Sequence, residues 1–107
     1  MPPSEPSLTV GIEEEYHLVD VGTRALVTEA PVGFMAECEQ ALGPQVAPEF
    51  LQPQVEVGTR PCRTLAEARA DLRRLRASVI ACAGRHGLAP IAASTHPFAQ
   101  PGQSLHT

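Results

Sequence analysis

Three consecutive carboxylates, Glu13, Glu14 and Glu15, lie inside a segment that otherwise has the pattern of a β-strand. Glu13 and Glu15 share one parity, and the other parity carries most of the apolar residues: Leu8, Val10, Ile12, Tyr16 and Leu18. Because a strand rises about 3.3 Å per residue and alternates its faces, we expect Glu13 and Glu15 side by side, about 7 Å apart at their bases. Such a pair repels unless a cation or a shared proton relieves it, and hard divalent cations take oxygen ligands. The spacing therefore indicates a metal site, with an ordinary solvated strand face as the alternative.

A further carboxylate, Glu56, lies in a second predicted strand that covers residues 49–58. Val55 and Val57 share one face of this strand, and Glu56 lies on the other face with Gln54. Pro53 cannot donate a ladder hydrogen bond, so we expect an edge or a bulge there. A carboxylate on a second strand can complete a metal site begun by Glu13 and Glu15.

A histidine, His96, follows the third predicted strand, Leu88–Ala93, which is mostly apolar and therefore expected at the centre of the sheet. His96 precedes Pro97, which biases its backbone toward an extended conformation. A histidine at the end of a strand can contact a ligand or donate a hydrogen bond. A structural role is the alternative for a single histidine of this kind.

The clearest element is a long helix that begins at Thr64, where Thr64 and Glu67 have the spacing of a capping box. Its apolar stripe recurs at steps of three and four: Leu65, Ala68, Leu72, Leu75, Val79, Cys82 and His86. Gly87 is expected as the C-cap. The arginines of this helix lie mostly off the stripe, and we interpret them as a solvated face: Arg69, Arg73, Arg74 and Arg76. A shorter helix is predicted over residues 32–42, and residues 25–27 are expected to pair back on the first strand.

The chain has 107 residues and a net charge of −4, which fits one small domain and argues against nucleic acid as a partner. No apolar run is long enough to cross a bilayer. Residues 1–7 are expected as a disordered tail without a signal peptide, and residues 100–107 as a loose end, so a cytoplasmic location is predicted. Cys38, Cys62 and Cys82 have no C-x-x-C spacing and are expected as small, partly buried thiols rather than zinc ligands.

Three segments occur in an order that is informative as a set: Gly11-Ile12-Glu13-Glu14-Glu15-Tyr16, Gln52-Pro53-Gln54-Val55-Glu56-Val57-Gly58-Thr59 and Thr95-His96-Pro97-Phe98. Together, over about residues 8–99, they resemble the start of the second glutamate–cysteine ligase family, the carboxylate–amine ligases. The resemblance implies a partial ligase-like α+β domain: an antiparallel sheet with helices packed on one face, part of a glutamine synthetase-like fold.

The resemblance also implies a reaction, in which ATP phosphorylates a substrate carboxylate and an amine then displaces phosphate to form an amide. The small-molecule substrates would be an amino acid carboxylate and an amine, with ATP as cosubstrate and Mg²⁺ as cofactor. Glu13, Glu15 and Glu56 match metal-binding glutamates of the family motifs. His96 falls in a segment that borders the family's substrate region.

The sequence departs from the family in length and in basic residues, because members are several times longer and this chain contains no lysine. We therefore predict an amino-terminal fragment of an ATP-dependent carboxylate–amine ligase that is inactive alone. The alternative is a non-enzymatic truncated domain that self-associates or pairs with a complementary chain. This alternative has a physical basis, since a sheet that is cut short leaves an open edge and an uncovered apolar face, and both favour association with another chain.

Overall fold

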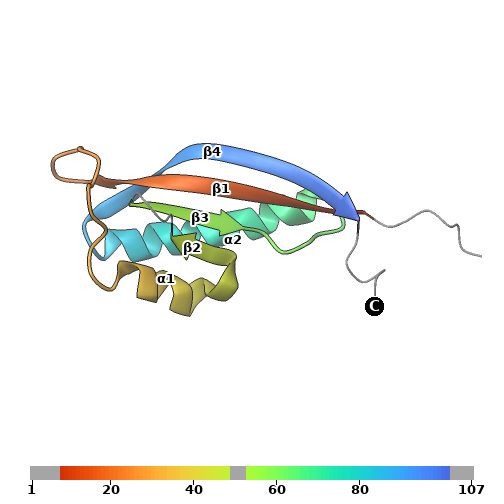
Figure 1. The fold of residues 1–107 in the computed structure, drawn as a ribbon, viewed down its shortest axis with the longest axis horizontal. Helices are drawn as coiled ribbons and strands as arrows, with labels where there is room; N and C mark the ends of the chain where they lie inside the picture. The colour runs from red at the N-terminus through yellow and green to blue at the C-terminus, as the bar shows by residue number, and fades with distance from the viewer. Residues whose placement is uncertain (1–7, 49–52, 102–107) are drawn as a thin grey trace, which may run out of the picture.

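The fold is a four-stranded antiparallel sheet with two helices on one face (Figure 1), seen in a computed structural model that describes residues 8–48 and 53–101. The elements are β1 (Leu8–Asp20), α1 (Phe34–Leu42), a 3-10 turn (Gly43–Gln45), β2 (Val46–Pro48), β3 (Gln54–Gly58), α2 (Leu65–Gly84) and β4 (Leu88–Pro101). The strand order is β2-β3-β1-β4. The predicted α+β class, with an antiparallel sheet and helices packed on one face, is confirmed. The wider likeness to the glutamine synthetase fold stays an expectation.

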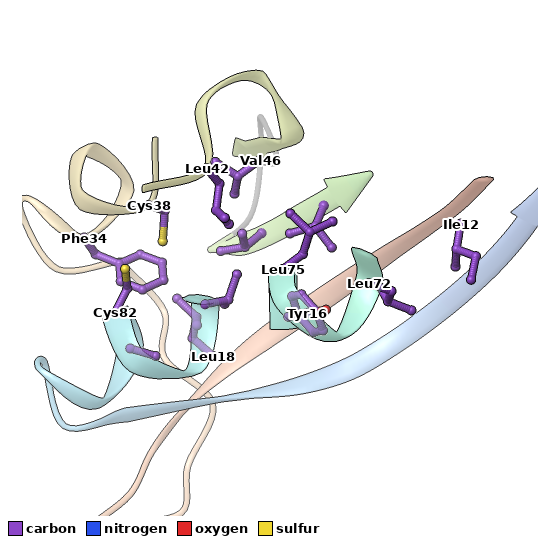
Figure 2. Close-up of a cluster of buried hydrophobic side chains, with 14 of the residues drawn as sticks. Ile12, Tyr16, Leu18, Phe34, Cys38, Leu42, Val46, Leu72, Leu75 and Cys82 are labelled. Carbon is purple, nitrogen blue, oxygen red and sulfur yellow. The ribbon is translucent and has the colours of Figure 1, made fainter. Parts of the chain in front are cut away.

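The hydrophobic core lies between the sheet and the helices, as Figure 2 shows. β1 alternates as the sequence predicts, with Tyr16 and Leu18 buried on the helix side. The predicted stripe of α2 packs against them through buried residues that include Leu72, Leu75 and Val79. Each buried aliphatic side chain contributes about 1.5–3 kcal/mol relative to exposure, so this layer holds α2 firmly on the sheet.

The start of α2 confirms the capping box with one difference in its partners. The Thr64 hydroxyl accepts a hydrogen bond from the Glu67 backbone N–H at 3.1 Å. The Glu67 carboxylate accepts from the backbone N–H of Arg63, one residue before the expected position. The helix ends at Gly84 rather than continuing to His86, and Gly87, at a φ of 72°, makes the turn into β4.

Two predictions about β4 are wrong, because it is an edge strand and extends to Pro101 instead of ending at Ala93. Ala93 is left unpaired as a β-bulge, since Glu15 pairs with Ser94 while Tyr16 pairs with Ala92. An extra residue of this kind shifts the alternation of a strand by one. The apolar run before Ala93 therefore lies on an edge, and the strand continues with its faces exchanged.

Smaller predictions also change. β3 begins after Pro53 and lies between β2 and β1, so Pro53 marks neither an edge nor a bulge within it, and residues 49–52 lie outside the described residues. β2 is not predicted by the sequence pattern. The expected return strand at residues 25–27 is reduced to a single bridge between Val19 and Leu26. The predictions for residues 1–7 and 102–107 fall outside the described ranges, whereas residues 100 and 101 are paired with β1.

Within residues 8–48 and 53–101, none of the helices combines the length and the apolar character needed for a bilayer span.

The free edge of β4 is poor in hydrogen-bond donors. The Ile12 backbone bonds to Thr59 on the β3 side, and the Leu18 carbonyl accepts from Val27, so both residues point away from β4. Their partners on β4, Pro97 and Pro90, therefore direct their backbone groups to the free edge. Because proline has no N–H, a proline on an edge strand cannot donate a hydrogen bond to another strand and so disfavours its addition.

Replacing these two prolines should promote self-association. The variant Pro90→Thr/Pro97→Thr restores two outward N–H donors, so we expect concentration-dependent dimers or larger species in sedimentation velocity. Ala92→Thr/Ala99→Thr is the matched control, because both residues face the same edge and already carry an N–H. A proline variant that sediments like the parent chain at every concentration would contradict this account of the edge.

Candidate functional site

The open face of the sheet, away from the helices, carries the four site residues that the sequence predicts. Glu15 on β1 is directly opposite Glu56 on β3. Glu13 is directly opposite His96 on β4. Directly opposite residues of an antiparallel pair project to the same face, and Glu13 and Glu15 share that face by alternation. The register therefore collects these residues, from three neighbouring strands, on one surface.

Glu15 and Glu56 form a close cross-strand pair. The Ile12 carbonyl accepts from the Thr59 backbone N–H, and the Ile12 N–H donates to the Thr59 hydroxyl, so Ile12 directs its backbone groups toward β3. Glu15, three residues on, directs its backbone groups the other way, which makes Glu15 and Glu56 a non-hydrogen-bonded pair. Cβ atoms at such positions lie about 4.5–5.5 Å apart. On the other side, the Ser94 hydroxyl donates to Glu15 Oε1 at 2.9 Å. Two half-buried carboxylates this close are a donor set suited to a hard cation.

Glu13 stands at a more open position, two residues before Glu15. It is exposed, and its partner on β3 is Gly58, which has no side chain. A Cβ added at Gly58 would lie 3.9 Å from Glu13 Cγ. The position on β3 directly opposite Glu13 therefore carries no side chain, while His96 flanks Glu13 on β4.

The two ends of this face are defined by other contacts. At one end, the Phe98 ring lies over Gly11, and a Cβ added at Gly11 would come within 2.6 Å of Phe98 Cζ. The glycine of the first motif is thus needed for space rather than for an unusual φ. At the other end, His17 Nδ1 and Gln54 Nε2 are 3.1 Å apart in a hydrogen bond. The carboxylates lie between an aromatic ring and this polar pair.

The open face offers a divalent cation carboxylate oxygens from β1 and β3. Oxygen donors on adjacent strands suit Mg²⁺, which is bound by one or two carboxylates together with phosphates and water. As the side chains stand, no group of three or more His, Cys, Asp or Glu in residues 8–48 and 53–101 is arranged to hold a metal ion. The metal role of Glu13, Glu15 and Glu56 stays a prediction that the strand register supports.

The middle carboxylate, Glu14, is fully buried on the helix side of the sheet. Arg76 of α2 donates to both of its oxygens, from Nε at 2.6 Å and Nη2 at 2.7 Å. The Thr95 hydroxyl of β4 donates to the same carboxylate at 2.6 Å. Hydrogen bonds from Arg76 lower the pKa of Glu14 from 4.5 to about 2, against the opposing effect of burial.

The Tyr16 hydroxyl is buried near this ion pair and has no hydrogen bond of good geometry to a described residue. Burial raises the pKa of Tyr16 above its usual 10, and the neighbouring Glu14 carboxylate raises it further. Tyr16 is therefore a neutral phenol that lines the inner side of the strand carrying Glu13 and Glu15.

Sequence reasoning missed Glu14 and assigned Arg76 to a solvated face. The signal was present, because Glu14 shares its parity with Ile12 and Tyr16 and therefore points into the core. A buried carboxylate needs a partner, and a neighbouring helix rich in arginine could have supplied the candidate. Arg76 is half-exposed, with 45% of its side chain accessible, so the interpretation as solvated holds for only part of it.

The cysteines are more fully buried than the sequence predicts, since Cys38, Cys62 and Cys82 are all buried free thiols. Burial, with a contribution from Cys82, raises the pKa of Cys38 to about 12. Thiols of this kind are poor nucleophiles at neutral pH.

Comparison with known proteins agrees with the motifs. Residues 9–107 match the family described as Glutamate-cysteine ligase family 2. A relative from Jannaschia sp. is 58% identical over 104 residues, covering 97% of this chain and 27% of the relative. A relative from Ruegeria pomeroyi is 54% identical over 99 residues, covering 92% and 26%. Both bear the name "Putative glutamate--cysteine ligase 2".

An α+β unit that presents paired carboxylates on an open antiparallel sheet is thus matched over nearly its whole length by a ligase family. The chain belongs to glutamate–cysteine ligase family 2. It spans about a quarter of the length of these two relatives.

The Glu14→Gln variant should be less stable than the parent chain, and its unfolding free energy should depend less on pH. The folded-state pKa of about 2 lies below the ordinary 4.5, so this stabilisation is complete above about pH 5 and is lost as pH falls toward 2. We expect the variant to lose about 2 kcal/mol of unfolding free energy at pH 7, because glutamine lacks the negative charge and has one acceptor oxygen instead of two for Arg76. Urea unfolding at several pH values measures both effects.

Glu13→Gln is the matched control, since Glu13 neighbours Glu14 in sequence but is exposed on the open face. Its unfolding free energy should stay within about 0.5 kcal/mol of the parent chain. Equal stability of the Glu14 variant and the parent across the acid range would contradict the role of the buried pair.

Proposed function

We propose that this chain forms one wall of the ATP- and magnesium-binding site of a carboxylate–amine ligase of the glutamate–cysteine type. The observation that carries the proposal is the register that sets Glu15 opposite Glu56, with Glu13 and His96 one step further along the same face. Membership of glutamate–cysteine ligase family 2 supports ligase chemistry. The names of the relatives support glutamate and cysteine as the substrates.

In this proposal Glu13, Glu15 and Glu56 hold Mg²⁺ through oxygen donors. Bound Mg²⁺ would supply electrostatic stabilisation for the charge that develops on phosphoryl oxygens during transfer. The Ser94 hydroxyl, which donates to Glu15, fixes the orientation of that carboxylate. His96, the partner of Glu13 on β4, contacts the substrate in the same proposal. The work of these residues is positioning rather than nucleophilic attack.

The alternative, a non-enzymatic domain that self-associates or pairs with a complementary chain, stays a prediction. Pro90 and Pro97 argue against strand addition along the free edge of β4. Self-association would then use the open face, where the carboxylates lie, or the short edge strand β2.

A chimera tests the ligase proposal directly. This chain would replace the matching segment of the Jannaschia relative, to which it is 58% identical. If that relative forms an amide from glutamate and cysteine with release of phosphate from ATP, we expect the chimera to do the same. Glu13→Gln and Glu15→Gln in the chimera should lower kcat about tenfold or more and raise the Mg²⁺ concentration needed for half-maximal rate.

The control is Glu39→Gln, which removes an exposed carboxylate from α1, on the other side of the sheet. Its kcat should match that of the unmodified chimera. An active chimera whose turnover and magnesium dependence survive Glu13→Gln and Glu15→Gln would refute the metal role.

The 107-residue chain alone should neither turn over ATP nor form an amide. It has no lysine, and none of the paired residues on the open face is an arginine that could hold phosphates. Phosphate release and amide formation would be measured with glutamate, cysteine, ATP and Mg²⁺. ATP-dependent amide synthesis by the purified chain would overturn this prediction.

A further inference from the structure

A shallow hollow of about 260 Å³ lies on the helix side of the sheet, opposite to the carboxylate face. Its walls come from α2, β1 and β4: Ile12, Arg69, Leu72, Arg73, Arg76 and Thr95. Three of these six residues are arginines, and no acidic residue belongs to the lining. The lining is thus positive, with the charge of Arg76 balanced by Glu14 beneath it, although the whole chain carries a net charge of −4.

The three arginines form one row along α2. Arg69, Arg73 and Arg76 are spaced by four and three residues, which places them on the same side of a helix with Cβ atoms about 5–6 Å apart. Like charges at this spacing destabilise a helix modestly. A row of this kind is therefore costly unless an anion compensates it.

Only the last arginine of the row is compensated within the described residues. Arg76 donates to Glu14 through Nε and Nη2, which anchors its guanidinium and leaves Nη1 available. Arg69 and Arg73 are exposed, and their side chains make no ion pair or hydrogen bond with another residue of 8–48 or 53–101. Two exposed guanidinium groups beside an anchored one can converge on a single small oxyanion.

The floor of the hollow is apolar, since Ile12 and Leu72 are core residues with 5% and 4% exposure. The remaining polar group, the Thr95 hydroxyl, is already used on Glu14. A ligand that contacts both the walls and the floor of the hollow would combine a negatively charged group, which pairs with the arginines, and a hydrocarbon portion, which packs on Ile12 and Leu72. The volume limits it to a small molecule, because typical ligand pockets begin at about 300 Å³.

We propose that this hollow is a second binding site, which takes a small carboxylate on an aliphatic stem. The carboxylate pairs with Arg69 and Arg73 and contacts the free Nη1 of Arg76, and the stem covers Ile12 and Leu72. The site is separate from the carboxylate face and does not depend on ligase activity. A ligand there also bridges α2 and β1, the two elements that Glu14 and Arg76 already join.

The probe is sodium hexanoate, titrated into the purified chain at constant ionic strength and followed through the arginine Nε resonances by NMR. We expect shifts at Arg69, Arg73 and Arg76 that saturate with a Kd in the millimolar range. Arg69→Gln/Arg73→Gln should weaken binding about tenfold or more, since both direct charge partners are lost. These exposed, unpaired side chains can be replaced without loss of the fold, which circular dichroism checks.

The matched control is Arg24→Asn/Arg63→Gln, which removes the same two charges from exposed positions outside the hollow. Its Kd should stay within twofold of the parent, and Glu13→Gln should also leave hexanoate binding unchanged. Equal loss in the control, or no loss in Arg69→Gln/Arg73→Gln, would overturn the site.

Two further ligands test which part of hexanoate is recognised. 1-Hexanol lacks the charge and inorganic phosphate lacks the stem, so both should bind more weakly than hexanoate. Hexanol binding as tightly would overturn the role of the arginines. Phosphate shifting the same resonances with an equal Kd would overturn the role of the apolar floor.

Discussion

The buried carboxylate of Glu14 is the constraint on which the arrangement of the site depends. Moving a carboxylate out of water costs several kcal/mol unless charged and polar partners replace the lost hydration. Arg76 supplies two hydrogen bonds from α2, and Thr95 supplies one from β4. The cost of an unpaired Glu14 therefore links three elements that are distant in sequence, and it disfavours any packing in which they separate.

The consequence for function is geometric. Because Glu14 is fixed toward the helices, its neighbours Glu13 and Glu15 must project from the opposite face of β1. A shift of one residue in register would expose Glu14 and bury its neighbours, which is unfavourable for all three. The run of three acids is thus divided between two tasks, with the middle residue anchoring the strand and the outer two facing the open side.

Much of this could be predicted from the sequence. Alternation in β1 and the stripe and capping box of α2 follow from local patterns, whereas the antiparallel class came from the family resemblance. The strand register supports grouping Glu13, Glu15, Glu56 and His96 on one face. The edge position of β4 could not be predicted from its apolar run. Such a run is typical of central strands, but it also occurs in an edge strand that packs on a core. The burial of Glu14 could have been predicted, because Glu14 shares its parity with the buried residues Ile12 and Tyr16.

The bulge at Ala93 is the feature with the largest consequence that the sequence does not reveal. Ile91 pairs with His17 on the open face, so without a bulge Ala93 and Thr95 would share that face, and Ser94 and His96 would face the helices. The extra residue exchanges these positions, which brings Thr95 to Glu14 and Ser94 to Glu15. The bulge at Ala93 therefore positions both donors, with Thr95 bonded to Glu14 on the helix side and Ser94 bonded to Glu15 on the open face. No propensity marks alanine as a bulge residue, and only the matching of partners across β1 and β4 selects it.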